Sequence, residues 1–218
     1  MKIKEYSFKG VNYKIACLER INFDPSWFTF EDEANVRDRD WNIEPEDIIL
    51  DIGSGFGSYT LTALATGASF VHCWNPAKEE NIILKESIEL NGWSEKVMIH
   101  EYGLYSKTGQ SSQSNRTYTK ELIEETFEVK ALDEIDLNLP EGRLLIKIDV
   151  EGAELEVLKG AERLISTRKP IILVENHQFM DDSLEERVQE FLNNLGYEQT
   201  SCHPYHKVTH SVHKPRLL

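Results

Sequence analysis

The central part of the chain alternates short apolar runs with longer segments of helical periodicity. Buried strands are predicted by the apolar runs 48–53, 69–74, 97–102, 143–150 and 171–175. Helices are predicted between and after them at 58–66, 78–90, 153–166 and 183–196, the last with a capping box formed by Ser183 and Glu186. Strands separated by helices imply parallel pairing with right-handed crossovers, so the pattern predicts a doubly wound α/β sheet.

Two segments flank this alternation. β-forming residues at mostly alternate positions around Gly10 predict a hairpin at 5–18, and an aromatic, acidic stretch without a clear period follows it. We therefore divide the chain into an N-terminal hairpin with an aromatic cap segment, 1–40, and a sheet domain, 41–218. Within that domain the polar stretch 103–120 predicts a loop or an irregular hairpin, 127–132 a strand, and the final residues two more strands.

Composition narrows the class of partner. The chain has 218 residues with 38 acidic and 24 basic side chains, a formal net charge of −14. Such a charge argues against a nucleic-acid partner and against an anionic membrane surface. No apolar run approaches the roughly 18 residues that a membrane span requires, and the first residues do not form a signal peptide. Three scattered cysteines indicate a reducing, cytoplasmic setting.

The first predicted strand runs into a turn with glycines at alternate positions. Asp51 precedes Gly53, Ser54 and Gly55, and Gly57 completes a G-x-G-x-G spacing. Dinucleotide sites need G-x-G-x-x-G, in which the backbone approaches a pyrophosphate. A carboxylate beside the turn suits a cationic amino acid group better than a pyrophosphate. S-adenosylmethionine (SAM) carries an ammonium and a sulfonium and no phosphate, so the turn favours SAM over a nicotinamide dinucleotide.

Further cofactor contacts are predicted beyond the glycine turn. Tyr59 and Thr60 begin the helix that follows it. Asn75 ends the second strand 20 residues after the middle glycine, where nucleotide-binding folds place an acid on the ribose hydroxyls. An asparagine can accept a hydroxyl proton but lacks the charge, and a simple turn role for it stays open. Tyr102 and Gly103, at the third strand end, are predicted to contact the adenine.

Acidic residues gather at the ends of the two later strands. Asp149 ends one strand and Glu151 follows it, while the next strand ends in Glu175 and His177. Ionisable groups that converge in this way perturb one another's pKa values, which is how a general base is prepared. We therefore predict these four residues to be catalytic. The same carboxylates could instead hold a divalent ion such as Mg²⁺, whereas Glu154 is explained by its place near a helix N-terminus.

Several segments together resemble the FkbM family of SAM-dependent methyltransferases. They are DIGSGFGSYTL, NPAKEENIILKESIELNG, PIILVE and, most specifically, KIDVEGAELEVLKGA, and the resemblance extends over about 41–196. It implies a class I methyltransferase (Rossmann-like) fold, with a seven-stranded sheet whose last strand is antiparallel. It also implies that Asp51, Gly53 and Gly55 hold the methionine part of SAM. Asn75 stands where the family usually has the Glu of an F-E-P motif.

The same resemblance implies methyl transfer to a hydroxyl of a sugar or another natural product. Asp149, Glu151 and Glu175 match the family's acidic strand-end motifs. We therefore predict an O-methyltransferase with a small hydroxylated acceptor, glycans included. The alternatives are a SAM-binding but inactive regulator or scaffold, an NAD-dependent oxidoreductase, and an RNA ribose methyltransferase, the last opposed by the acidic charge.

Two groups of residues are assigned to structure rather than chemistry. The final stretch is predicted to be a solvated tail or edge strand rather than a metal site, although it contains His203, His206, His210 and His213. An apolar cover for one sheet edge, or alternatively a cap on the acceptor site, is predicted from Trp27, Phe28, Phe30 and Trp41.

Overall fold

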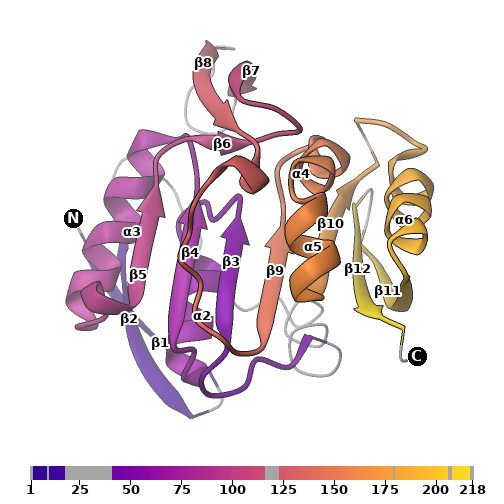
Figure 1. Cartoon of the computed structure of the whole chain (residues 1–218). Coiled ribbons are helices and arrows are strands. Elements are labelled where there is room, and N and C mark those ends of the chain that lie inside the picture. Colours follow the sequence, from indigo (N-terminus) through magenta and orange to yellow (C-terminus); the bar gives the residue numbers. More distant parts are fainter. Residues whose placement is uncertain are drawn as a thin grey trace.

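A central sheet organises the computed structural model, which describes residues 2–8, 10–17, 41–115, 123–178, 180–205 and 208–216. Within these residues seven strands pair in the order β11-β12-β10-β9-β3-β4-β5 (Figure 1). Their bounds are β3 (Ile48–Ile52), β4 (Phe70–Trp74), β5 (Val97–His100), β9 (Leu144–Ile148), β10 (Ile171–His177), β11 (Tyr197–Tyr205) and β12 (Val208–Pro215). Strands β5, β4, β3, β9 and β10 are parallel, and β12 is antiparallel to both of its neighbours. The predicted doubly wound sheet with an antiparallel last strand is confirmed.

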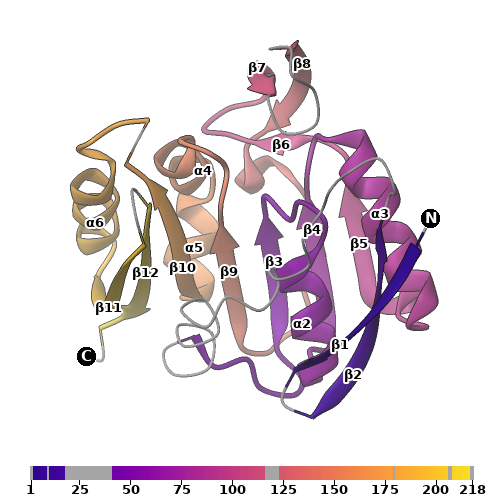
Figure 2. The same cartoon turned by 180° about the vertical axis from the view of Figure 1, so that it is seen from behind.

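Helices cover both faces of the sheet (Figures 1 and 2). They are α2 (Ser58–Thr66), α3 (Lys78–Leu90), α4 (Glu154–Gly160), α5 (Glu162–Arg168) and α6 (Leu184–Asn194). Alternate strand residues enter two separate cores, so that Ile49 of β3 packs on the α2 side while Ile48 and Leu50 pack on the α4 side. This alternation decides which strand-end side chains can meet, because residues two apart share a face.

The helix expected at 153–166 is two helices. Helix α4 ends at Gly160, where a Cβ would lie 2.0 Å from the carbonyl oxygen of Tyr105. Helix α5 then starts afresh, because the carboxylate of Asp133 accepts hydrogen bonds from the backbone N–H groups of Arg163 and Leu164. Asp133 belongs to the short 3₁₀ helix η4 (Leu132–Glu134). A distant side chain therefore supplies the cap, and the single-helix prediction was wrong.

The predicted capping box at the start of α6 does not form. Ser183 occupies the N-cap position but makes no side-chain cap hydrogen bond. Its hydroxyl and its backbone N–H both donate to the Asp181 carboxylate instead. Local turn chemistry thus competes with the cap for the serine.

The N-terminal hairpin forms as predicted. Strands β1 (Lys2–Phe8) and β2 (Val11–Cys17) pair antiparallel around Gly10. The backbone N–H of Ala16 donates to the Ser87 hydroxyl of α3, and Tyr13 and Ile15 join the core on the α2 side. The hairpin is therefore packed into the main core. Residues 18–40, including Trp27, Phe28 and Phe30, lie outside the described residues, whereas Trp41 is buried.

A small three-stranded sheet stands at the carboxyl end of the central sheet (Figure 1). It consists of β6 (Gly103–Leu104), β7 (Gly109–Asn115) and β8 (Ile123–Lys130), with β7 and β8 antiparallel. The described part of the polar stretch, 103–115, thus supplies β6 and β7, and β7 pairs with β8, which begins before the strand predicted at 127–132. Another short 3₁₀ helix, η3 (Ser94–Lys96), precedes β5. Among the described helices none is long and apolar enough to cross a membrane.

Two of the C-terminal histidines, His210 and His213, are on an inner strand, whereas His203 is on the edge strand β11. Strand β12 lies between β10 and β11, and therefore His210 and His213 are buried. Burial lowers the pKa of His213 to about 4, so that side chain is neutral. His203 faces His210 across the β11–β12 pair, and His206 lies outside the described residues. The prediction of a solvated tail or edge strand was therefore wrong for His210 and His213, because β12 inserts into the sheet.

Candidate active site

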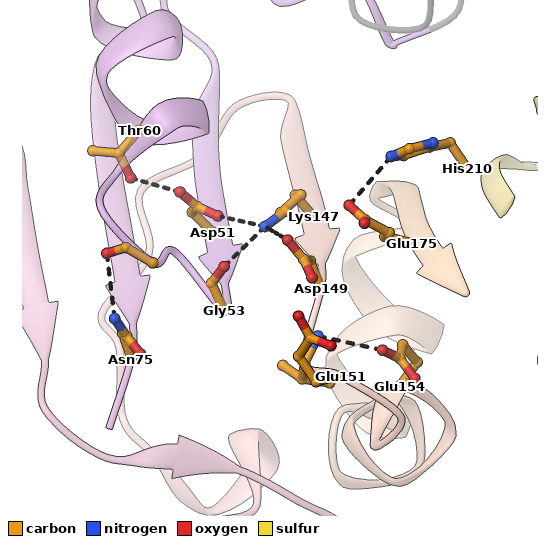
Figure 3. Close-up of polar contacts among 12 residues, drawn as sticks. Asp51, Gly53, Thr60, Asn75, Lys147, Asp149, Glu151, Glu154, Glu175 and His210 are labelled. Carbon is orange, nitrogen blue, oxygen red and sulfur yellow. Dashed lines mark hydrogen bonds and ion pairs between the residues drawn. The ribbon is translucent and has the colours of Figure 1, made fainter. Parts of the chain in front are cut away.

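The carboxyl ends of β3, β9 and β10 bring charged side chains to one face of the sheet (Figure 3). Asp51 pairs in register with Lys147, and Lys147 with Leu173. Residues two positions further along β9 and β10 share this face, which adds Asp149 and Glu175. The structure therefore brings together the acids that the sequence placed at separate strand ends. It also adds a lysine that the sequence analysis had not assigned.

Lys147 is the centre of a group of charged and polar side chains, which we call the lysine cluster: Lys147, Asp51, Asp149 and Thr60. The ammonium Nζ lies 2.8 Å from Asp149 Oδ2 and 3.6 Å from Asp51 Oδ1, and its side chain is 3% exposed. Thr60 donates a 2.7 Å hydrogen bond to Asp51 Oδ2. Burial opposes the charge on the ammonium, but Asp149 and Asp51 raise the pKa of Lys147 overall. The lysine is therefore a permanent buried cation.

This arrangement changes the roles expected of Asp51 and Thr60. Both side chains are completely buried, and the Asp51 carboxylate is directed at Lys147 and Thr60 rather than outward. Lys147 in turn donates a 2.9 Å hydrogen bond to the carbonyl oxygen of Gly53. Asp51 and Thr60 thus hold the lysine that fixes the glycine turn. Direct contact between either side chain and a ligand would need this cluster to open.

The glycine turn has one open position and one closed one. At Gly53 (φ +80) a Cβ would lie 1.7 Å from the carbonyl oxygen of Asp149, so glycine is required there by packing. At Gly55 (φ +53) the nearest atom to such a Cβ is Glu80 Oε2, at 3.9 Å. Ser54 carries a buried hydroxyl for which the described residues provide no hydrogen-bond partner. Bare backbone beside an unsatisfied hydroxyl fits a polar ligand such as SAM.

Other predicted cofactor contacts are packed into the protein. Tyr59 is buried with its ring centroid 4.8 Å from Lys147 Nζ. Lys130 Nζ lies over the ring of Tyr102, 4.4 Å from the ring centroid. A Cβ at Gly103 would lie 3.0 Å from the ring of Phe127. The structure brings these residues near the carboxyl edge, but each is occupied by an intramolecular contact.

Trp74, which precedes Asn75 at the end of β4, is likewise internal. It is fully buried, and its ring stacks on His100 with centroids 4.4 Å apart and planes 9° apart. His72 continues the same stack. Burial lowers the pKa of both histidines to about 4, and they are therefore neutral. The three stacked rings therefore pack on one another at the β5 edge of the sheet and do not line a ligand site.

A second group, the histidine cluster, lies at the ends of β9 and β10: His177, Asp149, Glu151, Glu175 and Glu154. The imidazole Nδ1 is 2.8 Å from Glu154 Oε1, a hydrogen bond that fixes the ring. Three carboxylates face Nε2 at 3.6 to 3.7 Å. Glu175 also contacts His210, whose Nε2 is 3.2 Å from Glu175 Oε2 (Figure 3). The cluster is thus an imidazole surrounded by acids from β10, from α4 and from the loop between β9 and α4.

The charges in the histidine cluster are set by these neighbours. Burial opposes a charge on His177, yet the hydrogen bond to Glu154 and the charges of Asp149 and Glu151 raise its pKa to about 9. At neutral pH the ring is therefore an imidazolium, which cannot accept a proton. Burial raises the pKa of Asp149, but Lys147 and His177 outweigh it and lower the pKa. At neutral pH His177 is therefore a cation, and Asp149 is an ionised carboxylate that pairs with Lys147.

Glu151 differs from the other acids in the cluster. Its side chain is 55% exposed, whereas that of Glu175 is 17% exposed. Burial of part of the side chain and the neighbouring acids Asp149 and Glu175 raise the pKa of Glu151, against the opposing effect of His177. Its backbone has a φ of +55, which is rare for a residue with a side chain. Glu151 is the acid of this cluster that combines solvent access with a raised pKa.

The sequence analysis missed two members of the site. Glu154 was explained by its place at a helix start, yet it is completely buried and accepts hydrogen bonds from His177 and from the backbone N–H groups of Val150 and Gly152. Lys147 was given no role from the sequence, although a single lysine inside an apolar strand indicates a buried acidic partner. Both residues position others.

The histidine cluster also has the composition of a cation site. Ligand atoms of Asp149, Glu151 and His177 all lie within 4.8 Å of one another. The hydrogen bond from His177 Nδ1 to Glu154 is the outer contact that usually orients a metal-bound histidine. A cation would have to displace the proton of the imidazolium. The residues are therefore suited to a divalent metal only when His177 is neutral.

Comparison with known proteins identifies the family. The model of the FkbM methyltransferase domain matches residues 25–198. No curated protein matches the chain in sequence. A solved FkbM methyltransferase from Methylobacillus flagellatus KT is similar, with a TM-score of 0.58 and 18% identity. The match covers 77% of this chain but only 43% of that one.

Two further solved structures share the fold over most of both chains. A precorrin-6y C5,15-methyltransferase from Geobacter metallireducens GS-15 has a TM-score of 0.53 and 14% identity, covering 93% of this chain and 95% of that one. A ribosomal protein L11 methylase from Lactobacillus delbrueckii subsp. bulgaricus has a TM-score of 0.54 and 12% identity, covering 89% and 81%. At such identities these likenesses show the class I methyltransferase fold alone. The domain match over most of the chain goes further: this chain belongs to the FkbM family of SAM-dependent methyltransferases.

Proposed function

We propose that the chain transfers a methyl group to a hydroxyl of a small molecule, such as a sugar or another natural product. The observation that carries this proposal is the exposed carboxylate of Glu151, with a raised pKa, beside a buried imidazolium. A hydroxyl holds its proton at neutral pH, so O-methylation needs a nearby acceptor for that proton. The net charge of −14 supports a small or neutral acceptor over a polyanionic RNA.

Each residue has a distinct task in this proposal. The open backbone at Gly55 and the Ser54 hydroxyl hold the cofactor, which supplies a methyl group already activated by its sulfonium. Glu151 takes the proton of the acceptor hydroxyl. His177, fixed by Glu154, places a positive charge beside the oxygen as that oxygen becomes negative. Alignment of the reacting groups can supply ~7–11 kcal/mol, and base assistance a further ~10²–10⁴-fold.

A metal-assisted version uses the same residues. Asp149, Glu151 and His177 would hold a divalent cation, which would bind and polarise the acceptor hydroxyl. Chelation distinguishes the two versions. Transfer that is lost with EDTA and restored by Mg²⁺ or Mn²⁺ supports the metal, whereas unchanged transfer supports Glu151 acting alone.

The three cysteines are free thiols, which supports the proposed reducing, cytoplasmic setting.

The test is a transfer assay with SAM and a panel of sugars, phenols and other hydroxylated compounds, read out as S-adenosylhomocysteine. Glu151→Gln should lower the rate by about 10²–10⁴-fold, with cofactor affinity unchanged. Glu156→Gln is the matched control, because Glu156 lies on α4 and pairs with the exposed Lys159. Full activity of Glu151→Gln would remove Glu151 from the mechanism. Tight cofactor binding without turnover on any compound would favour the inactive scaffold.

A further inference from the structure

The amide of Asn75 is already committed to the protein. Its Nδ2 donates to the carbonyl oxygen of Gly55 at 3.2 Å and to Glu80 Oε2 at 2.8 Å, and its Oδ1 accepts from the backbone N–H of Ala77 at 3.2 Å. The side chain is 5% exposed. Asn81 adds a 2.8 Å hydrogen bond to the Asn75 carbonyl oxygen. Asn75 is therefore a clamp between the glycine turn and α3 and is poorly placed to accept from a ribose.

Glu80 places its carboxylate beside Asn75 and the glycine turn. It lies in the first turn of α3 and is half-buried. Its Oε2 is held by Asn75 and is the nearest atom to the open position at Gly55, 3.9 Å from where a Cβ would stand. The dipole of the helix favours an acid in this first turn whichever way its side chain points, so the dipole alone does not direct Glu80 toward the glycine turn. Glu79, also acidic and in the same turn, is exposed.

We propose that Glu80 is the acid that accepts the ribose hydroxyls of SAM. In α/β nucleotide sites that acid stands about 20 residues after the glycines, the position that Asn75 occupies here. In this chain the charge has moved to the first turn of α3, and the Asn75 amide holds it beside the glycine turn. A carboxylate accepts from two neighbouring hydroxyls through charge-assisted hydrogen bonds. The preferred ligand class is thus a ribonucleoside with both hydroxyls free.

The inference rests on cofactor binding and not on the proposed acceptor, so the two can fail separately. Calorimetry with S-adenosylhomocysteine is the first measurement. Glu80→Gln should weaken binding by roughly 10- to 100-fold, as loss of a charged hydrogen-bond partner does. Glu79→Gln is the matched control and should change the dissociation constant less than about twofold. Asn75→Glu combined with Glu80→Gln should recover part of the affinity.

A second measurement changes the ligand instead of the protein. S-adenosylhomocysteine should bind the wild-type protein more tightly than its 2′-deoxy and 3′-deoxy analogues, by roughly 10-fold or more for at least one of them. Glu80→Gln should bind all three about equally. Wild-type affinity and unchanged discrimination in a folded Glu80→Gln protein would overturn the assignment. Failure of the wild-type protein to bind S-adenosylhomocysteine would overturn it too, while failure to methylate any hydroxyl with cofactor bound would leave it standing and refute only the proposed function.

Discussion

The lysine cluster and the histidine cluster meet at Asp149 and differ in how far water reaches them. In the first, the cation is 3% exposed and two aspartates face it; in the second, Glu151 is 55% exposed. The cation of the lysine cluster is permanent, whereas that of the histidine cluster titrates near pH 9. Similar residue types at neighbouring strand ends therefore hold a turn in one place and can move a proton in the other.

The largest expected effect is a loss of stability when the lysine cluster is disrupted. Lys147→Met leaves Asp51 and Asp149 without their cation, and the free energy of unfolding should fall by about 3–5 kcal/mol. Urea denaturation measures this. Lys159→Met is the control, since Lys159 forms a short but exposed pair with Glu156 and should cost less than about 1 kcal/mol. If both variants lost a similar amount of unfolding free energy, water would have to reach the lysine cluster.

The next effect concerns the titration of His177 in the histidine cluster. The pKa of His177 is raised from 6.5 to about 9, so its contribution to stability is complete below pH 6.5 and is lost as the pH rises through 9. At 1.36 kcal/mol per pKa unit the loss is roughly 3 kcal/mol. His177→Gln removes the titrating group, and the stability difference between the two proteins should shrink over pH 6.5–9. A constant difference would mean that folding does not raise the pKa of His177.

Asp149 belongs to both clusters, so its removal should affect both. Asp149→Ala should lower transfer and should also cost about 1.5–3 kcal/mol, because Lys147 loses its 2.8 Å partner and keeps Asp51 at 3.6 Å. Denaturation and activity are measured on the same samples. Loss of activity with full stability would show that Lys147 does not depend on Asp149 for its stability in the fold.

The smallest effect tests the backbone of Glu151. Its φ of +55 costs a residue with a side chain about 1–2 kcal/mol, which glycine avoids. Glu151→Gly should therefore raise the melting temperature while it lowers transfer. Glu151→Gln keeps the strain and should lower transfer alone. A destabilised Glu151→Gly protein would show that the side chain contributes more to the fold than its exposure indicates.

Sequence periodicity was sufficient for most of the fold. The apolar runs of β3, β9 and β10, the hairpin at the N-terminus and the helices α2 and α3 were predicted near their observed bounds. Glycines marked the turn after β3, and acids marked the strand ends. These features are local, because they depend on which residues follow one another and on the periods of helix and strand.

Tertiary structure decided the rest, through contacts between residues far apart in the chain. Asp133 splits the helix expected at 153–166, and β12 enters the sheet and buries His210. Lys147 neutralises Asp51, 96 positions earlier in the sequence. A buried charge is stable only beside its partner, and the partner is chosen by the packing of strands rather than by order along the chain. The sequence by itself therefore determined the sheet and its reactive edge, while only the folded structure decided which acid is shielded and which one faces the solvent.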